Sequence, residues 1–508
     1  MKINKKIWSM IFLSSLLLIL AFPKTDWYWL AWIAFVPLFV VCETATLKES
    51  FWRFFWSGFV FFLGAFYWIG ISGLMVGMPW LAVLTFLGTV LLCGYLALYF
   101  GLFGIMYFYR RKILLPLFVL PAFWVILEFF RSIILSGFGW GALGYSQYKN
   151  LPVIQIADVT AVYGVSFAVF FVNLCFYKAY FYRRELFKVA GWILVSLATI
   201  GWLWWYGLGC IKYFDKSSAS IKVAVVQGNV PQDQKWDEKR WPAIMDKYTN
   251  LTKQALVARP DLLIWPETAF PGILWEDEKY FEILKTVASE NKIPILVGSV
   301  VAENNKYFNS ALLLGSDGAL AGRYDKIHLV PFGEYVPFRE QAPILGSLIP
   351  ITDFTSGTKT TILDFNKVRF AVLICFEDTI PELVRQFVDT GAQFLVNITN
   401  DAWFADTKSP YLHLQSSVFR AVENRRSVVR AANTGISCFI SPYGKIIRYL
   451  MDAKGKATYV EGIAQDNVEV SSQRTFYTRH GNVFIFICII FFLLGMIGFL
   501  IKRRAQGE

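Results

Sequence analysis

Charged residues are distributed unevenly along this chain, and no other feature of the sequence limits its fold as strongly. Charges are sparse up to about residue 211 and dense from there to about 480, and only 17% of the residues are charged. A helix needs roughly 20 mostly apolar residues to cross a bilayer. Candidate spans lie at about 7–22, 27–42, 54–73, 80–109, 113–131, 158–180, 189–210 and 483–501. We therefore expect a membrane domain of about seven helices at 1–211, a water-facing domain at 212–480, and a membrane helix with a cytoplasmic tail at 481–508.

Basic residues in the short loops predict the orientation of these spans, because such loops stay in the cytoplasm. If eight spans alternate, one side receives Lys2, Lys5, Lys6, Lys48, Arg53, Arg110, Arg111, Lys112, Arg183, Arg184, Lys188, Lys502, Arg503 and Arg504. The polar region then lies on the opposite, outward face. Much of the net charge of +12 is accounted for in this way, so we do not expect nucleic-acid binding. The first span could instead be a signal peptide, but no clear cleavage site follows it.

Short apolar runs alternate with helical patterns through the polar region. Strands are predicted at 221–227, 261–267, 294–300, 307–315, 318–326, 368–376, 392–399 and 436–448, the last as a hairpin. Helices are predicted at about 238–258, 277–291, 381–389 and 410–430. This alternation predicts a layered α/β domain with a buried sheet. Residues 327–360 have little regular character, and so long a loop is usually functional or mobile.

Three reactive residues end predicted strands: Glu267, Lys326 and Cys375. Functional sites gather beyond the carboxyl ends of strands in α/β sheets. A carboxylate can take the proton of a thiol, and an ammonium can stabilise both the thiolate and an oxyanion. Taken singly, a strand-end cysteine is more often a core residue, and a strand-end Glu or Lys a solvated boundary residue.

Longer motifs favour the catalytic interpretation. WPE at 265–267, YDKIHLVPFGEYVP at 324–337 and LICFED at 373–378 resemble the signature segments of the nitrilase, or carbon–nitrogen hydrolase, superfamily. NITNDAWF at 397–404 and RAVENRRSVVRAANTG at 420–435 resemble one branch of it, the apolipoprotein N-acyltransferases of bacterial inner membranes. GWGALGYSQ at 139–147 and VYGVSF at 162–167 extend this resemblance into the apolar region.

The resemblance implies an αββα sandwich for the polar domain, facing the periplasm from the bacterial inner membrane. It also implies an enzyme that moves an acyl chain from a phospholipid, typically phosphatidylethanolamine, to the α-amino group of a lipoprotein's diacylglyceryl-cysteine. By position, Cys375 would form the thioester, Glu267 would be the general base and Lys326 would hold the oxyanion. A thioester conserves the energy of acyl transfer, so neither a cofactor nor a metal is expected.

The same resemblance assigns supporting roles. Glu334 would orient or charge the site beside Lys326, Glu377 would support the nucleophile turn, and Trp236 would lie near the substrate. The family usually has Tyr directly after the nucleophile, where this chain has Phe376. Any role of a phenol is therefore in doubt, whereas the backbone N–H of Phe376 remains available to an oxyanion.

Several other residues carry weaker expectations. Cys438 could pair with Cys375, but we expect a separate core thiol, and the scattered cysteines and histidines predict no metal site. His328 follows Lys326 closely and is expected to be a hydrogen-bonded loop residue. Glu128 and Arg131 stand at a span end and could pair at the interface. The apolar residues of the long loop could dip into a bilayer or pack on their own domain: Leu329, Val330, Phe332, Val336, Phe338, Ile344 and Leu345.

Two rival functions remain open. A membrane-tethered amidase could hydrolyse small amides with the same three residues, but it would need one anchor at most. A transporter or receptor would place paired charges or broken helices at mid-membrane, whereas nearly all charges here lie at span ends.

Overall fold

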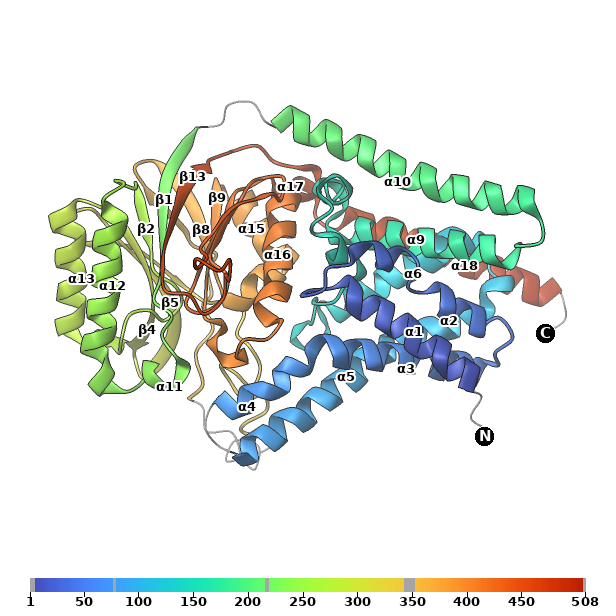
Figure 1. The fold of residues 1–508 in the computed structure, drawn as a ribbon, viewed down its shortest axis with the longest axis horizontal. Helices are drawn as coiled ribbons and strands as arrows, with labels where there is room; N and C mark the ends of the chain where they lie inside the picture. The colour runs from blue at the N-terminus through green and yellow to red at the C-terminus, as the bar shows by residue number, and fades with distance from the viewer. Residues whose placement is uncertain (1–4, 76–78, 215–218, 342–351, 506–508) are drawn as a thin grey trace. The chain divides into compact units, whose positions relative to one another are not determined.

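The computed structural model describes residues 5–75, 79–214, 219–341 and 352–505 (Figure 1). The chain divides into two compact units. One comprises Met1–Gly70, Val83–Asp215 and His480–Glu508, and the other comprises Ile71–Ala82 and Lys216–Arg479.

The first unit is helical. Its main helices are α1 (Lys5–Ala21), α3 (Leu47–Phe66), α5 (Pro79–Phe108), α6 (Pro116–Arg131), α9 (Val162–Phe181), α10 (Leu186–Phe214) and α18 (Val483–Ala505). Within the described part of the chain, five helical stretches are long and apolar enough to cross a membrane: Leu47–Met75, Trp80–Arg111, Val162–Phe181, Leu186–Lys212 and Val483–Ile501. The expected spans at 7–22 and 113–131 form the shorter helices α1 and α6, of 17 and 16 residues.

The single span predicted at 27–42 is wrong in detail. This stretch forms a 3₁₀ helix at Tyr28–Trp32 and then α2 (Val36–Val41). Pro37 stands in the first turn of α2, where its missing N–H is no loss, so a new helix begins there. The span predicted from residue 158 likewise begins later, because Ala161 has a positive φ of 53° and separates the short α8 (Ala157–Thr160) from α9.

The second unit contains two sheets. The first has the order β13-β1-β2-β4-β5-β6, with β3 also paired to β4, and the second has the order β12-β11-β10-β9-β8-β7. The first sheet is built from β1 (Ser220–Gln227), β2 (Leu262–Ile264), β3 (Ile273–Leu274), β4 (Ile295–Glu303), β5 (Lys306–Leu314), β6 (Leu320–Asp325) and β13 (Gly462–Glu469). The second is built from β7 (Ile362–Phe365), β8 (Val368–Ile374), β9 (Phe394–Thr399), β10 (Val428–Ala432), β11 (Cys438–Ile440) and β12 (Ile446–Tyr449).

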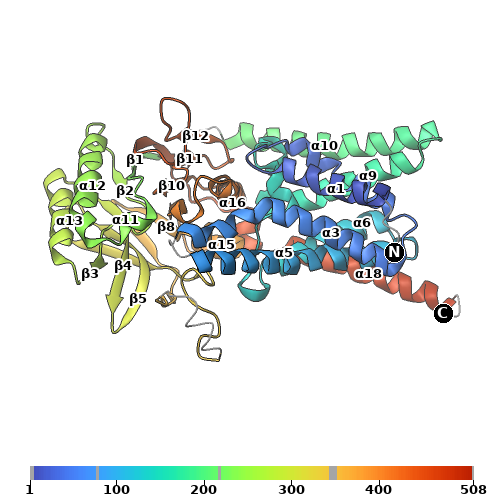
Figure 2. The same ribbon diagram turned by 60° about the horizontal axis from the view of Figure 1, so that its bottom comes forward.

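Helices cover the outer faces of both sheets. In both views α12 (Trp241–Leu256) and α13 (Glu278–Asn291) lie together against the first sheet (Figures 1 and 2). Their apolar faces share a core with β1, β2 and β4, in which Tyr248 stacks on Trp265 at 4.8 Å between ring centroids. On the other side, α15 (Pro381–Asp389) and α16 (Ser409–Asn424) cover the second sheet (Figure 1). Contacts of β1 with β10 and of β5 with β8 join the sheets, which gives four layers.

Two predictions in this unit were wrong. The helix predicted at 410–430 ends at Asn424, because Arg425 adopts a left-handed φ of 50°. The chain then forms β10, which runs parallel to β9. The strand predictions also missed β7 and β13, since β13 is polar and pairs antiparallel with β1 from far along the chain. The two sheets with helices on their outer faces agree with the expected αββα sandwich. Within the long loop, Ile344 and Leu345 lie outside the described residues.

Candidate active site

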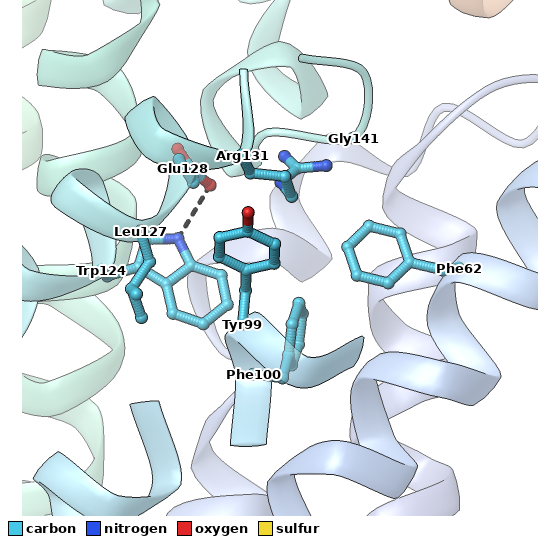
Figure 3. Close-up of a pocket in the computed structure, with 8 residues that line it drawn as sticks. All are labelled: Phe62, Tyr99, Phe100, Trp124, Leu127, Glu128, Arg131 and Gly141. Carbon is cyan, nitrogen blue, oxygen red and sulfur yellow. Dashed lines mark hydrogen bonds between the residues drawn. The ribbon is translucent and has the colours of Figure 1, made fainter. Parts of the chain in front are cut away.

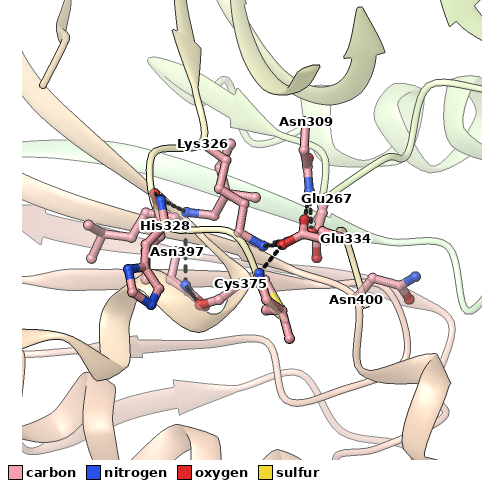
Figure 4. A network of polar contacts seen from close by, with 12 residues as sticks. Glu267, Asn309, Lys326, His328, Glu334, Cys375, Asn397 and Asn400 are labelled. Carbon is pink, nitrogen blue, oxygen red and sulfur yellow. Dashed lines mark hydrogen bonds and ion pairs between the residues drawn. The ribbon is translucent and has the colours of Figure 1, made fainter. Parts of the chain in front are cut away.

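Glu267, Lys326 and Cys375 come together between the two sheets (Figure 4). Glu267 follows β2, Lys326 directly follows β6, and Cys375 directly follows β8. The Nζ atom of Lys326 lies 4.0 Å from Oε1 of Glu267. Strand ends from both sheets therefore supply the three side chains, which come from three separate segments of the sequence.

Glu334 and Asn309 complete a buried ion-pair network around Lys326. The Nζ atom of Lys326 lies 2.7 Å from Oε2 of Glu334, and Lys326 is only 1% exposed. The amide nitrogen of Asn309, on β5, donates to Glu267 and to Glu334 at 2.8 Å each. The backbone N–H of Val330 donates to Glu334 as well. Two carboxylates are thus held apart by one amide and share one ammonium.

Burial sets the protonation states at this site. It raises the pKa of Glu267, and the charge of Lys326 only partly opposes that shift. For Lys326, burial acts to lower the pKa, but Glu334, Cys375 and Glu267 outweigh it and hold the pKa above its ordinary value. Lys326 is therefore an ammonium, and Glu267 has an increased affinity for a proton.

Cys375 begins a 3₁₀ turn, η7 (Cys375–Thr379), in a left-handed conformation with φ of 53°. Such a conformation in a non-glycine residue is strained and often marks a functional site. The amide of Asn397 and Nε2 of His413 hold the Cys375 carbonyl at 3.0 and 3.1 Å. Burial and the charge of Glu267 raise the pKa of the thiol well above its ordinary value. The resting thiol is protonated, so attack by its sulfur requires a base.

Glu377 ties the nucleophile turn to the segment that carries Lys326. Its carboxylate accepts the hydroxyl of Tyr324 at 2.7 Å and the backbone N–H groups of Ile327 and His328 at 2.8 and 3.1 Å. Its second oxygen accepts the N–H of Ile374 at 2.8 Å. Burial raises the pKa of Glu377, and four donors satisfy its oxygens. The side chain therefore fixes Cys375 and Lys326 in register.

A second buried network lies behind Cys375. Asp378 contacts His413 at 2.8 Å and Arg430 at 2.9 Å, and Nδ1 of His413 lies 3.3 Å from Asp401. Burial opposes a charged ring, but Asp378 more than compensates, and the pKa of His413 is raised to about 9. Since both ring nitrogens face acceptors, His413 is an imidazolium that braces the nucleophile turn.

The remaining site candidates take different places. Phe376 stacks on His328 at 6.0 Å between ring centroids, so the ring packs without a phenol. Trp236 directly follows the short helix α11 (Gln232–Lys235), and its side chain is 47% exposed. Cys438 is a buried free thiol in β11. Among the residues that the structure describes, no group of three potential ligands could hold a metal ion.

Sequence reasoning missed Lys235, Asn309, Asn397 and His413. Lys235 is buried, and its Nζ donates to the Glu267 carbonyl at 3.0 Å. Asn309 and His413 come from β5 and α16, whose sequences indicate only an apolar strand and an amphipathic helix, and Asn397 of β9 is the first residue of the segment NITNDAWF but was assigned no role. The one available signal was polar residues inside otherwise buried segments, because such groups need buried partners.

In the helical unit, Glu128 and Arg131 are both buried. Glu128 accepts from Trp124 Nε1 at 2.8 Å and from the backbone N–H of Leu143 at 2.7 Å, while Arg131 donates to the Trp140 carbonyl at 2.6 Å. Both line a small cavity with aromatic rings (Figure 3). These hydrogen bonds anchor the segment that follows α6 to the helix itself.

Two family models match the chain. A model described as carbon–nitrogen hydrolase matches residues 222–470, and one described as apolipoprotein N-acyltransferase N-terminal domain matches residues 14–175. The second unit is thus a nitrilase-like domain, joined to a region of apolar helices. A solved amidase from Nesterenkonia sp. is similar to 54% of this chain over 97% of its own length, with 18% identity and a TM-score of 0.39.

Full-length relatives define the family. The apolipoprotein N-acyltransferase of Geobacter metallireducens is 39% identical over 505 residues, covering 96% of this chain and 94% of the relative. That of Pasteurella multocida is 30% identical over 519 residues, covering 99% and 98%. This chain belongs to the apolipoprotein N-acyltransferase family and is an acyltransferase.

Proposed function

We propose that this protein moves an acyl chain from a phospholipid such as phosphatidylethanolamine to the N-terminal α-amino group of diacylglyceryl-modified lipoproteins. The observation that carries this proposal is the placement of Cys375 beside Glu267 and Lys326 in a chain whose described residues include five membrane-length helices. Small soluble amides need no such helices, whereas membrane-spanning helices would hold the site at the bilayer surface, where two lipid-anchored substrates lie.

In the first half-reaction, the Cys375 thiol gives its proton to Glu267 as the sulfur attacks the ester carbonyl of the phospholipid. The ammonium of Lys326 and the backbone N–H of Phe376 stabilise the oxyanion. The carbon–oxygen ester bond breaks, and the lysophospholipid alkoxide leaves with the proton from Glu267. The products are a Cys375 thioester and Glu267 as a carboxylate again.

In the second half-reaction, the free amine of the lipoprotein attacks the thioester. Glu267 removes a proton from the attacking nitrogen and returns one to the departing sulfur, so the amide forms and the thiol is restored. Glu334 keeps Lys326 charged and in place through both steps, since its carboxylate pairs with the ammonium at 2.7 Å.

The proposal includes the membrane arrangement. Residues 1–211 and 481–508 would lie in the bacterial inner membrane, and residues 212–480 would face the periplasm. Phe332 and Phe338, at 55% and 73% exposed, would then contact the bilayer interface and admit acyl chains. Val336 is buried and anchors this loop to its own domain. Trp236, exposed beside Lys235, would contact the substrate.

The test is N-acylation of a synthetic diacylglyceryl-cysteine peptide by the purified protein in detergent with phosphatidylethanolamine. We expect Cys375→Ser to abolish the product, while Cys438→Ser, which alters a buried thiol of β11, retains it. Undiminished activity of Cys375→Ser would contradict the mechanism. Ammonia release from small amides without peptide acylation would instead favour an amidase.

A further inference from the structure

Lys235 is a second lysine buried at the site, and the proposed mechanism does not use it. It ends α11, is 6% exposed, and donates from Nζ to the backbone carbonyl of Glu267 at 3.0 Å. It also lines a small cavity whose other walls are mostly apolar, including Val230, Ile244 and Ala269. A buried ammonium is costly unless charge or hydrogen bonds offset the loss of water.

The groups that offset this cost are the reacting groups themselves. Burial lowers the pKa of Lys235 to about 8, and Glu267 and Cys375 act in the opposite direction. In return, Lys235 acts to lower the pKa of Glu267. Because the attraction is mutual, the charge of Lys235 favours both the ionised carboxylate and a thiolate at position 375.

We propose that Lys235 is a positioning residue for the nucleophile, whose charge makes the Cys375 thiolate accessible and whose hydrogen bond fixes Glu267. This inference takes from the proposed function only that Cys375 is the nucleophile. Together Lys235 and Lys326 balance the two carboxylates that share Asn309.

The surrounding charges show why a second lysine matters. Besides the effect of Glu267 on Cys375, the charged groups that act most strongly on these two residues include Lys326, Lys235, Glu334 and Asp401. Asp401 contacts His413, and His413 also contacts Asp378, which pairs with Arg430. Glu377 lies nearby and adds a further buried carboxylate. Removing the charge of Lys235 leaves more of this negative charge uncompensated beside Cys375, which opposes formation of a thiolate.

Three variants of the full-length protein separate charge from hydrogen bonding. Lys235→Gln keeps an N–H donor for the Glu267 carbonyl but removes the charge. Lys235→Met removes both and keeps the apolar stem. Lys235→Arg keeps the charge. The rate of iodoacetamide alkylation of Cys375, followed by peptide mass spectrometry across a range of pH, reports the apparent thiol pKa and needs neither lipid nor peptide substrate.

We expect Lys235→Gln and Lys235→Met to slow alkylation near neutral pH on the order of tenfold, as a rise of about one unit in the thiol pKa requires. Lys235→Arg should stay near the wild-type rate. Wild-type alkylation kinetics in the folded Lys235→Gln protein would overturn the inference. If the wild-type protein alkylates at Cys375 but transfers no acyl group, the proposed function fails and the role of Lys235 is still decided by these rates.

Discussion

At the scale of single residues, the protonation of Cys375 and Glu267 determines how the site can work. Burial raises the pKa of both groups, so the resting thiol keeps its proton and Glu267 has an increased affinity for one. A stable thiolate would be readily oxidised, whereas a protonated thiol is less reactive at rest. Under the proposed mechanism, the thiol therefore gives its proton to Glu267 as the sulfur attacks.

This pairing predicts the pH dependence of Cys375 acylation. Glu267 must be ionised to accept the proton, so the rate falls as pH drops through the Glu267 pKa. Since burial raises that pKa, half-maximal rate should lie above the value of about 4.3 for a solvated Glu. Single-turnover acylation rates across pH measure it. Glu267→Gln should slow acylation by about 10²–10⁴-fold and should remove the fall in rate at low pH. If the rate of the Glu267→Gln variant fell at low pH as it does in the wild type, the titrating group would be a residue other than Glu267.

Glu267, Lys326 and Cys375 could be predicted from sequence because each ends an apolar run and lies in a recognisable motif. Lys235, Asn309 and His413 could not. Each owes its role to a partner from another element: the Glu267 carbonyl, the two carboxylates, and the pair Asp378 and Asp401. Such contacts depend on how the sheets face one another, and no local pattern records that.

At the scale of elements, the junction between β8 and η7 carries strain. A left-handed conformation costs an L-residue with a Cβ about 1–2 kcal/mol, which glycine does not incur, although glycine loses about 0.5–1 kcal/mol more in chain entropy. Cys375→Gly should therefore be more stable than Cys375→Ala by about 0.5–1 kcal/mol, with both inactive. Thermal unfolding of the two variants in the same detergent tests this.

In an ordinary strand, glycine lowers stability relative to alanine. A Cys375→Gly variant less stable than Cys375→Ala would therefore contradict the prediction. Matched variants at Val372, inside β8 and fully buried, supply the control: Val372→Gly should be less stable than Val372→Ala. The same order at both positions would mean that the turn at Cys375 is not strained.

Element boundaries explain the remaining errors of prediction. Polar residues from Glu423 to Ser427 join α16 to β10, and such residues are equally compatible with the exposed face of a longer helix, so the pattern alone did not mark Asn424 as an end. Strand β13 has the sequence GIAQDNVE and lacks an apolar run, and pairing with β1 alone makes it a strand. In contrast, β1 was predicted to within one residue and β4 and β8 to within three, because each is a buried apolar run rich in β-branched residues.

At the scale of the whole molecule, the charge pattern predicts which side of the membrane each part occupies. The C-terminus and the loop around Arg183 should be cytoplasmic, and the exposed turn at Asp452–Lys456 should be periplasmic. A fluorescent protein that folds only in the cytoplasm should be fluorescent when fused at the C-terminus. Alkaline phosphatase, active only outside, should be active when inserted at the turn. The reverse pattern would place the catalytic site in the cytoplasm.

The central claim is that Cys375 accepts an acyl chain directly from a phospholipid. Its most direct test is intact-peptide mass spectrometry of the purified protein after incubation with phosphatidylethanolamine alone, without any amine acceptor. The account predicts an acyl mass on the Cys375 peptide that hydroxylamine removes, and none on the Cys438 peptide. An unmodified Cys375 in a protein that still N-acylates the peptide would contradict it.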